Sequence, residues 1–483
     1  MVSIPVWAFV ALCVFAAWAA LDRVFLPGLR WLLRRRVNRI IEELNASLAL
    51  RLEPMRLTGR QVLIDRLLYD EEVQTAALAH AREHGMRHDE VMAEVGTYAR
   101  EIVPGFNAYA YFRIGYLLVR SVARALYRVR LGAARDGDLR AIPDGACVVF
   151  VMNHRSNMDY LLVAYLAATR SALSFAVGEW ARVWPLQTLL RALGAYFIRR
   201  GSGNDLYRKV LARYVSMATA AGLTQAMYPE GGLSKTGALQ SARLGLLAYM
   251  VRGFKVRTAE LAAAQERAQP FDVVFIPVGI NYDRVLEDRT LLALRDRTER
   301  APPPVAGLLG LMRFLGNQMW LAVTGRWYRF GYAGVGFGQP VSLSRYSAEQ
   351  GVDWHDEARF REQVESLGNH LLDAVGNVVP VLPVALTAKV MLDAERPLDV
   401  LEVKNRIVAL IEHLEAGGVH VHVPRADRDY AVNVGIRMLE LRRMIANVGG
   451  LLEAVPAEAD LLGYYAASID HYFAGQSAGG ADE

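Results

Sequence analysis

Between residues 146 and 337, short apolar runs alternate with longer stretches in which apolar positions recur every three or four residues. The short runs are β-rich, and they predict strands at 146–152, 173–177, 195–199, 223–228, 273–280 and 332–337. The longer stretches predict helices at 156–169, 185–193, 205–221 and 240–252. This alternation predicts an α/β fold in which a largely parallel sheet is flanked by helices.

Helical patterns surround the predicted sheet on both sides. The chain therefore divides into an anchor, a helical N-terminal region, the α/β domain, a helical C-terminal region and a disordered tail, at 1–22, 23–104, 105–345, 346–473 and 474–483. In the C-terminal region we expect helices at 357–375, 385–393, 400–416, 432–447 and 461–473.

The first 21 residues contain no charged side chain. About twenty apolar residues are enough for a helix to cross a bilayer, so we expect a transmembrane anchor at 1–22. Arginines follow this run and none precedes it, which predicts that the rest of the chain lies on the cytoplasmic side. A buried amphipathic helix is the alternative.

Two further stretches bear on membranes. Residues 105–130 predict a helix with one basic face, formed by Arg113, Arg120, Arg124 and Arg128. Such a face commonly lies on an anionic membrane surface; a solvated face on a helix packed against its own domain is the alternative, and the two are compatible. Residues 305–323 are apolar but interrupted by Arg313, so we expect a core or interfacial helix there and not a second membrane span.

Composition narrows the class of protein. The chain has 483 residues, of which 53% are hydrophobic and 22% charged, so it can bury a large core. The net charge of +5 is small, and the N-terminal arginines flank an apolar run, which argues against nucleic-acid binding. Cys13 and Cys147 both lie in apolar runs, so neither a disulfide framework nor a thiolate metal site is indicated.

The first candidate site follows the strand predicted at 146–152. Asn153 comes directly after it, then His154, and Asp159 stands five positions after the histidine. Inside one regular helix these side chains would point about 140° apart, so they can meet only if His154 precedes the helix. Ser156 and Asp159 form a capping pattern that would start the helix there. Capping alone and an ordinary loop histidine are the alternatives.

A paired histidine of this kind has a definite chemistry. A carboxylate bound to one imidazole nitrogen fixes the tautomer and raises the basicity of the ring. The other nitrogen is then free to take a proton from a hydroxyl group.

Three more motifs follow predicted strands, where open α/β sheets place their ligands. The stretch 194–200 ends in Arg199 and Arg200, whose guanidinium groups are suited to phosphate or carboxylate. In 230–237, glycines allow close backbone approach and Ser234 and Lys235 offer donors to an anion. An ordinary glycine turn is the alternative, and the spacing excludes a nucleotide P-loop.

The last motif, at 274–283, is a buried strand interrupted by Pro277, which either lines a pocket or marks an edge strand. Two other patterns are set aside. His420 and His422 would share one strand face, but no third metal ligand accompanies them. The Gly-x-Ser-x-Gly elbow of hydrolases is absent, so there is no candidate serine nucleophile.

In this order the four motifs resemble the glycerophospholipid acyltransferase family, in particular the membrane-bound glycerol-3-phosphate acyltransferases of bacteria. Residues 154–162 resemble that family's first block, with its His-x-x-x-x-Asp pair. The stretches 194–200, 230–237 and 276–283 resemble the second, third and fourth blocks. The likeness covers about 105–345, and the tyrosines and histidine near 464–473 are similar to the family's C-terminal end.

The resemblance implies a mechanism and its partners. His154 would be the general base, oriented by Asp159, and would deprotonate the sn-1 hydroxyl of glycerol 3-phosphate. The oxygen would attack the thioester of acyl-CoA or acyl-acyl carrier protein without a covalent acyl-enzyme, and no metal or other cofactor is implied. The residues nominated for substrate binding are Arg199, Arg200, Glu230, Gly231, Ser234, Lys235 and Pro277.

The resemblance also implies a single-pass protein of the cell inner membrane in contact with membrane lipid. One position departs from the family pattern, because Leu233 stands where the third block usually has arginine. A lysophospholipid, dihydroxyacetone phosphate or another lipid precursor therefore remains an alternative acceptor. A membrane-tethered lipid-binding protein without catalysis is the alternative from another class, and the intact pair of His154 and Asp159 argues against it.

Overall fold

The computed structural model describes residues 60–105, 116–131, 142–143, 145–167, 174–177, 190, 194–199, 203–264, 270–295, 330–424 and 427–473. The predicted anchor, the apolar stretch 305–323, the tail and Arg200 lie outside these ranges, as does the predicted helix 185–193 apart from Leu190. Within these ranges, no helix is both long enough and apolar enough to cross a membrane.

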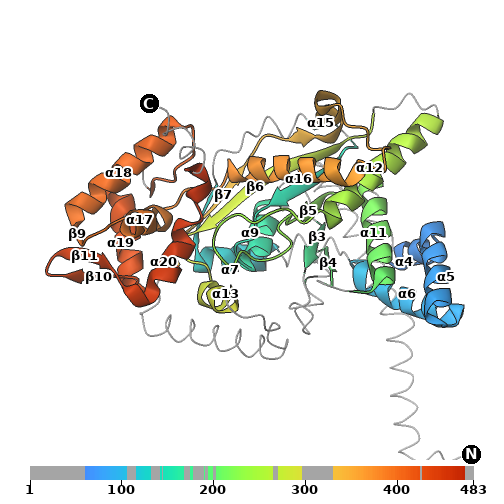
Figure 1. Cartoon of the computed structure of the whole chain (residues 1–483), viewed down its shortest axis with the longest axis horizontal. Helices are drawn as coiled ribbons and strands as arrows, with labels where there is room; N and C mark the ends of the chain where they lie inside the picture. The colour runs from blue at the N-terminus through green and yellow to red at the C-terminus, as the bar shows by residue number, and fades with distance from the viewer. Residues whose placement is uncertain are drawn as a thin grey trace, which may run out of the picture.

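A sheet forms the centre of the molecule (Figure 1). It has eight strands in the order β1-β7-β6-β2-β5-β3-β4, with β8 also paired to β6. The strands are β1 Arg128–Leu131, β2 Cys147–Met152, β3 Ser174–Val177, β4 Ala195–Phe197, β5 Gln225–Met227, β6 Val273–Tyr282, β7 Tyr332–Phe337 and β8 Val341–Ser342. Strands β6, β2, β5, β3 and β4 run parallel, whereas β7 and β8 are antiparallel to β6. The predicted α/β sheet is confirmed, with an antiparallel step at β6.

The two central strands, β2 and β6, are buried at every position. Alternate residues of β2 belong to two separate apolar clusters, with Val149 in one and Phe150 in the other. This is the consequence of a strand covered on both faces, and it explains why the sequence shows a continuous apolar run there.

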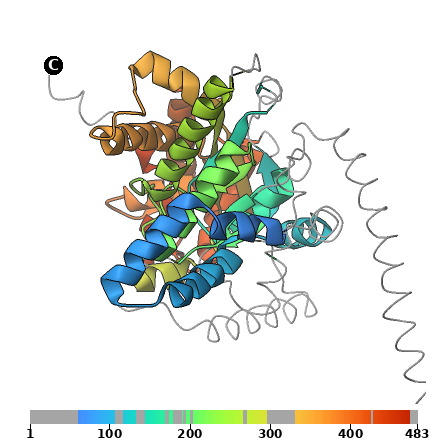
Figure 2. The same cartoon turned by 90° about the vertical axis from the view of Figure 1, so that its right-hand side faces the viewer.

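One face of the sheet is covered by helices that precede β6 in the chain, together with α16. Figure 2 shows α4–α6 packed beside α11. These helices are α4 Arg60–Leu68, α5 Glu71–His84, α6 His88–Ile102, α11 Asp205–Ala220, α12 Gly245–Ala263 and α16 Phe360–Gly376. Asn204 caps α11 by accepting a hydrogen bond from the Tyr207 N–H (2.9 Å).

The other face packs against α9 (Met158–Ala167) and the C-terminal helices, which Figure 1 shows gathered at one end of the sheet beside β6 and β7. The C-terminal helices are α17 Pro383–Leu392, α18 Val400–Ala416, α19 Arg428–Leu441 and α20 Ala459–Ala466. One apolar cluster contains Ile276 and Val278 of the sheet together with Leu386 and Leu439 of these helices. The predicted α/β and C-terminal regions therefore share a core.

Two predicted helices are wrong at their C-terminal ends. The stretch 105–130 contains α7 (Tyr116–Leu126), but β1 follows it and pairs in parallel with β7. Arg128 therefore leaves the helical face that carries Arg120 and Arg124. Pairing with a distant strand overrides the local helical pattern there.

The helix predicted at 432–447 ends at Leu441. Strands β10 (Ile445–Val448) and β11 (Leu451–Ala454) then form a hairpin, which pairs with β9 (Leu398–Asp399). The two turn residues, Gly449 and Gly450, have φ values of 61° and 91°. A Gly-Gly pair is a typical signal for a tight hairpin turn, and it outweighs the helical periodicity around it.

Candidate active site

His154 lies in the loop of residues 153–157 between β2 and α9, called here the His154 loop. Its Nδ1 atom is 2.9 Å from Asp159 Oδ2, and the two side chains are 1% and 0% exposed. Asp159 stands in the first turn of α9, so the two groups face each other across the start of the helix. The predicted geometry of this pair is confirmed.

The Asp159 carboxylate has several other donors. Its Oδ2 atom accepts hydrogen bonds from the backbone N–H groups of Arg155 (2.7 Å) and Ser156 (3.0 Å). Its Oδ1 atom accepts one from the Tyr282 hydroxyl (2.6 Å). An ionised carboxylate can only accept, so His154 Nδ1 must donate, and the lone pair of the ring resides on Nε2.

The capping pattern is also present. Ser156 Oγ accepts a hydrogen bond from the Met158 N–H (3.1 Å), while the Ser156 N–H donates to Asp159. Helix capping and orientation of the histidine are therefore not alternatives, because one carboxylate does both.

Aromatic rings enclose the imidazole. The Tyr228 ring stacks on it with a centroid separation of 4.1 Å, and the Tyr160 ring meets it edge-on at 5.2 Å. The Tyr160 hydroxyl lies 3.2 Å from Nε2. Because Nε2 carries the lone pair, the phenol is the donor in this contact. The structure thus shows a hydroxyl group bound at the nitrogen that can act as a base.

Glu230 ties the third motif to the His154 loop. Its two carboxylate oxygens accept the backbone N–H groups of His154 (2.9 Å) and Gln240 (3.1 Å). The Ser234 N–H donates to the His154 carbonyl (2.9 Å), so both backbone polar groups of His154 bind this motif. Burial raises the pKa of Glu230 to about 7, against the lowering effect of the two N–H groups.

The rest of the third motif forms a tight turn. Gly231 and Gly237 have φ values of 69° and 89°, and a Cβ on either would collide with Arg243 or with the Tyr464 carbonyl. The Ser234 hydroxyl donates to the Ala238 carbonyl (2.7 Å) and accepts from the Gly237 N–H (3.0 Å). The glycines are required by the fold, and the serine hydroxyl stabilises the turn.

Two predicted cations have protein partners in this structure. The exposed Lys235 donates from Nζ to the Leu294 carbonyl (2.9 Å). Arg199 follows β4, three strands from β2 in the sheet and hence roughly 14 Å from it. Its Nε and Nη2 atoms bind the Glu101 carboxylate of α6 at 3.1 and 2.8 Å, and this contact raises the pKa of Arg199.

Pro277 lies within β6, opposite Val151 of β2, so the edge-strand alternative is wrong. The outer neighbour of β6 changes from β8 at Phe275 to β7 at Val278. Pro277 falls in the gap between them, where its carbonyl accepts the Gly338 N–H (2.8 Å). A residue without an N–H is tolerated in a central strand at this point because the outer ladder is interrupted there.

Several residues that hold the site were not singled out from the sequence. The Asn153 side-chain amide makes two hydrogen bonds to the backbone of Ile280 in β6. It donates to the Ile280 carbonyl (2.9 Å) and accepts from the Ile280 N–H (2.7 Å). Glu287 accepts the Ser156 hydroxyl (2.8 Å) and the Asn157 N–H (3.3 Å), and burial raises its pKa. Asn153 directly precedes the first motif, whereas no local pattern marks Glu287.

Arg155 is a buried cation beside the pair. Its Nη1 atom donates to the Gly237 carbonyl, and its guanidinium lies 4.7 Å above the Tyr464 ring. In the described part of the chain, no group of three or more His, Cys, Asp or Glu side chains is arranged to hold a metal ion.

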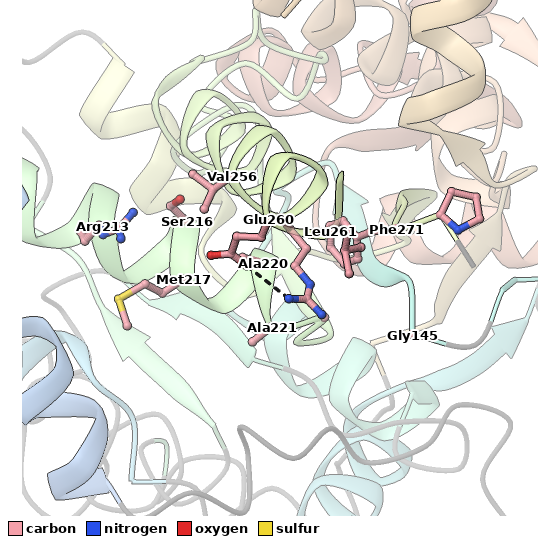
Figure 3. A pocket seen from close by; sticks show the side chains of 13 residues that line it. Gly145, Arg213, Ser216, Met217, Ala220, Ala221, Val256, Glu260, Leu261 and Phe271 are labelled. Carbon is pink, nitrogen blue, oxygen red and sulfur yellow. Dashed lines mark hydrogen bonds and ion pairs between the residues drawn. The ribbon is translucent and has the colours of Figure 1, made fainter. Parts of the chain in front are cut away.

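A separate pocket of about 620 Å³ lies between α11 and α12 (Figure 3). Gly145 and Phe271, which precede β2 and β6, contribute to its lining, and Arg257 and Glu260 form an ion pair beside it (3.2 Å). This pocket is at the amino-terminal edge of the sheet. His154 follows the carboxyl end of β2, so the pocket is not its substrate site.

Two protein-family models match this chain. Residues 135–281 match the model described as acyltransferase, and residues 319–479 match the model described as the glycerol-3-phosphate acyltransferase C-terminal region. Together they include His154, the third motif and the helices α17–α20. The resemblance seen in the four motifs is confirmed.

Curated proteins similar to this chain include glycerol-3-phosphate acyltransferases of three bacteria. The relatives from Aeromonas hydrophila and Xanthomonas axonopodis pv. citri are each 26% identical to it over 87% of its length, and the relative from Shewanella loihica is 27% identical over 86%. The matched regions are 51%, 47% and 50% of these relatives, so the chain spans about half their length.

Among solved structures, a 1-acyl-sn-glycerophosphate acyltransferase from Thermotoga maritima is similar to 65% of this chain and 95% of its own, with 15% identity and a TM-score of 0.29.

Proposed function

We propose that this chain, a relative of the glycerol-3-phosphate acyltransferases with both their acyltransferase domain and their C-terminal region, transfers a fatty acyl group to the sn-1 hydroxyl of glycerol 3-phosphate. The donor is a thioester, either acyl-CoA or acyl-acyl carrier protein. The observation that carries the proposal is the polarity of His154. Its Nδ1 donates to Asp159, while Nε2 accepts from a hydroxyl group.

The chemistry follows from this polarity. The acceptor hydroxyl gives its proton to His154 Nε2 while its oxygen attacks the thioester carbonyl carbon. The tetrahedral intermediate then collapses and expels the thiolate, which takes the proton back from the imidazolium. The Asp159 carboxylate stabilises that imidazolium, and no covalent acyl-enzyme forms.

Tyr160 marks the place of the acceptor. Its hydroxyl occupies the hydrogen-bonding position at Nε2 in this structure, where His154 is almost fully buried. The acceptor hydroxyl takes over this position, so the Tyr160 side chain has to move when substrate binds.

The phosphate of the acceptor is bound by cations at the carboxyl edge of the sheet. Arg199, Arg200 and Lys235 are the proposed cations, and Glu230, Gly231, Ser234 and Pro277 shape the backbone around the site. The paired N–H donors of Arg199 match phosphate as well as they match the Glu101 carboxylate. Phosphate binding by Arg199 therefore requires it to exchange one anion for another.

The membrane location is part of the same proposal. The predicted anchor at 1–22, uncharged up to residue 21, holds the chain in the inner membrane as a single pass, with the acyltransferase domain on the cytoplasmic side. This places the site beside the lipid into which its product partitions.

The test uses membranes that carry the full chain. They are incubated with labelled acyl-CoA or acyl-acyl carrier protein and with glycerol 3-phosphate, dihydroxyacetone phosphate or a lysophospholipid. We expect acylation of glycerol 3-phosphate, lost in His154→Ala and retained in His355→Ala, a control at an exposed loop histidine. Equal activity in His154→Ala would rule out the mechanism, and activity only on a lysophospholipid would rule out the acceptor.

A further inference from the structure

Residues 282–288 run from the last residue of β6 to the first residue of α13, between the site and the C-terminal helices; they are called here the connecting segment. At its start, the Tyr282 hydroxyl binds Asp159 (2.6 Å). Near its end, Glu287 binds the hydroxyl of Ser156 and the N–H of Asn157 (2.8 and 3.3 Å). The segment therefore holds the His154 loop and the first turn of α9 at two separate points.

The C-terminal helices hold the same segment from the other side. The Tyr465 hydroxyl of α20 donates to Asp288 and accepts from the Val285 N–H (3.0 Å) and from Arg442 Nη1 (2.8 Å). A hydroxyl has one donor and two acceptor positions, so all three are used. The second Arg442 nitrogen, Nη2, binds Asp288 Oδ2 at 2.6 Å.

This cluster of Arg442, Tyr465 and Asp288 is shielded from water. The Arg442 and Asp288 side chains are 10% and 6% exposed, and Tyr465 is fully buried. The arginine also lies 5.3 Å from the centre of the tyrosine ring. A buried ion pair whose remaining hydrogen-bonding positions are filled has one well-defined arrangement, and removal of one partner leaves the other uncompensated.

The position of Asp288 determines the position of Glu287, because the two residues are adjacent in the chain. Asp288 is the first residue of α13 (Asp288–Arg295), and Glu287 precedes it directly. The Leu291 N–H binds the Glu287 carbonyl (2.8 Å), so Glu287 belongs to the same rigid helical turn. When Asp288 is held, the Glu287 carboxylate is held as well, and with it the Ser156 hydroxyl that starts α9.

We propose that Tyr465 and Arg442 are positioning residues for acyl transfer. They fix the connecting segment, and Glu287 and Tyr282 then keep His154 and Asp159 in their reactive geometry. The C-terminal region is on this view part of the catalytic apparatus. The inference rests on the proposed function, since the reaction that it tunes is the one proposed there.

The test compares two variants of the full chain at the junction between α13 and the C-terminal region. Tyr465→Phe removes one buried hydroxyl. Arg289→Ala removes an exposed ion pair to Glu458 (2.9 Å) across the same junction and is the matched control.

For Tyr465→Phe we expect kcat to fall roughly tenfold or more, because small displacements of reacting groups are costly, with KM values changed less than about twofold. We expect Arg289→Ala to stay within about twofold of the unchanged chain in kcat. If Tyr465→Phe does not fold, Arg442→Lys replaces it, since it keeps the charge and loses one of the two contacts.

A double-mutant cycle separates positioning from general damage. Tyr465→Phe and Glu287→Gln disturb the same path, so their combined effect on kcat should be clearly smaller than the product of the single effects. A combined effect equal to that product would overturn the proposal. So would a lower thermal midpoint in Tyr465→Phe with kcat per folded molecule unchanged.

A measurement without substrate keeps this test apart from the proposed function. Amide hydrogen exchange of the peptide 153–160 should be faster in Tyr465→Phe than in the unchanged chain, and unaltered in Arg289→Ala. If the unchanged chain fails to acylate glycerol 3-phosphate, the proposed function fails and the exchange experiment still decides on positioning. Equal exchange in Tyr465→Phe and the unchanged chain would overturn it.

Discussion

Asp159 accepts four hydrogen bonds, from the imidazole of His154, the N–H groups of Arg155 and Ser156, and the hydroxyl of Tyr282. Two of these donors are backbone N–H groups just before α9, and one is the side chain of Tyr282 at the end of β6. The carboxylate is therefore held from three directions before any substrate arrives. Such preorganisation means that little reorganisation is needed when the imidazolium forms.

Glu230 should make stability depend on pH in a definite direction. Burial raises its pKa from 4.5 to about 7, so the folded protein binds this proton more tightly than the unfolded chain does. The free energy of unfolding therefore falls as pH rises from about 4.5 to about 7. The side chain in Glu230→Gln cannot ionise. The thermal midpoint of this variant should therefore rise relative to that of the unchanged chain as the pH increases from about 5 to about 8.

The difference between the two thermal midpoints is the quantity to measure, by calorimetry on the full chain. Asp283 has a similarly raised pKa but is present in both proteins, so its contribution cancels. A difference that stays constant from pH 5 to pH 8 would contradict the raised pKa of Glu230.

Leu233 offers a test of the acceptor site. It is half-buried in the third motif and packs against the apolar cluster that contains Ile276. An arginine there would present paired donors to a phosphate. We expect Leu233→Arg to lower the KM for glycerol 3-phosphate severalfold. Leu233→Met is the control for altered packing, and an unchanged KM would mean that this position does not face the phosphate.

At the scale of elements, β6 organises the site. Its ten residues pair with β2 on one side and with β8 and then β7 on the other, and Tyr282 at its end reaches Asp159. Asn153 joins the His154 loop to the same strand. The orientation of the loop is thus set by two strands and not by the loop sequence alone.

Asp283 binds the first backbone N–H groups of two elements, the strand β7 and the helix α17. Its carboxylate accepts the Tyr332 N–H at the start of β7 (2.7 Å) and the Val384 N–H in the first turn of α17 (3.1 Å). Leu382, at the N-cap position of α17, has no side-chain oxygen for this purpose. Asp283→Ala leaves two buried donors without a partner and should lower the free energy of unfolding by about 3 kcal/mol.

The control for Asp283→Ala is Asp399→Ala. Asp399 is an exposed cap of α18 that accepts the Glu402 N–H (2.8 Å), so its loss should cost only about 1 kcal/mol. Denaturant unfolding measures both values. Equal costs for the two substitutions would show that Asp283 is no more than an ordinary cap.

At the scale of the whole molecule, the C-terminal helices complete the core of the sheet. The apolar cluster on one face of β2 and β6 continues into α17, α18, α19 and α20 without interruption. A core shared in this way makes folding of the two regions interdependent, because neither can bury its apolar surface alone.

Cleavage in an exposed loop tests this interdependence. His355, Asp356 and Glu357 lie between α15 (Leu343–Gln350) and α16, and a protease site introduced there should be cut without loss of structure. We expect the two fragments to remain together in gel filtration under native conditions and to separate only in denaturant. Separation without denaturant would contradict a common core.

The order of strands and helices between β2 and β7 could be predicted from the sequence, because burial on both faces leaves continuous apolar runs bounded by turn residues. The pairing of His154 with Asp159 could be predicted for a similar reason, since the two residues are five positions apart and the start of a helix fixes their geometry. The four motifs also indicated the resemblance to the glycerol-3-phosphate acyltransferases without any tertiary information.

Only the tertiary structure decided the contacts between distant parts of the chain. Arg199 meets Glu101 across 98 positions, Ser156 meets Glu287 across 131, and Tyr465 meets Asp288 across 177. The order of strands in the sheet and the packing of helices on it bring these residues together, and no local periodicity encodes that order. For the same reason, β1 formed where the local pattern favoured helix, because its partner β7 lies far away in the sequence.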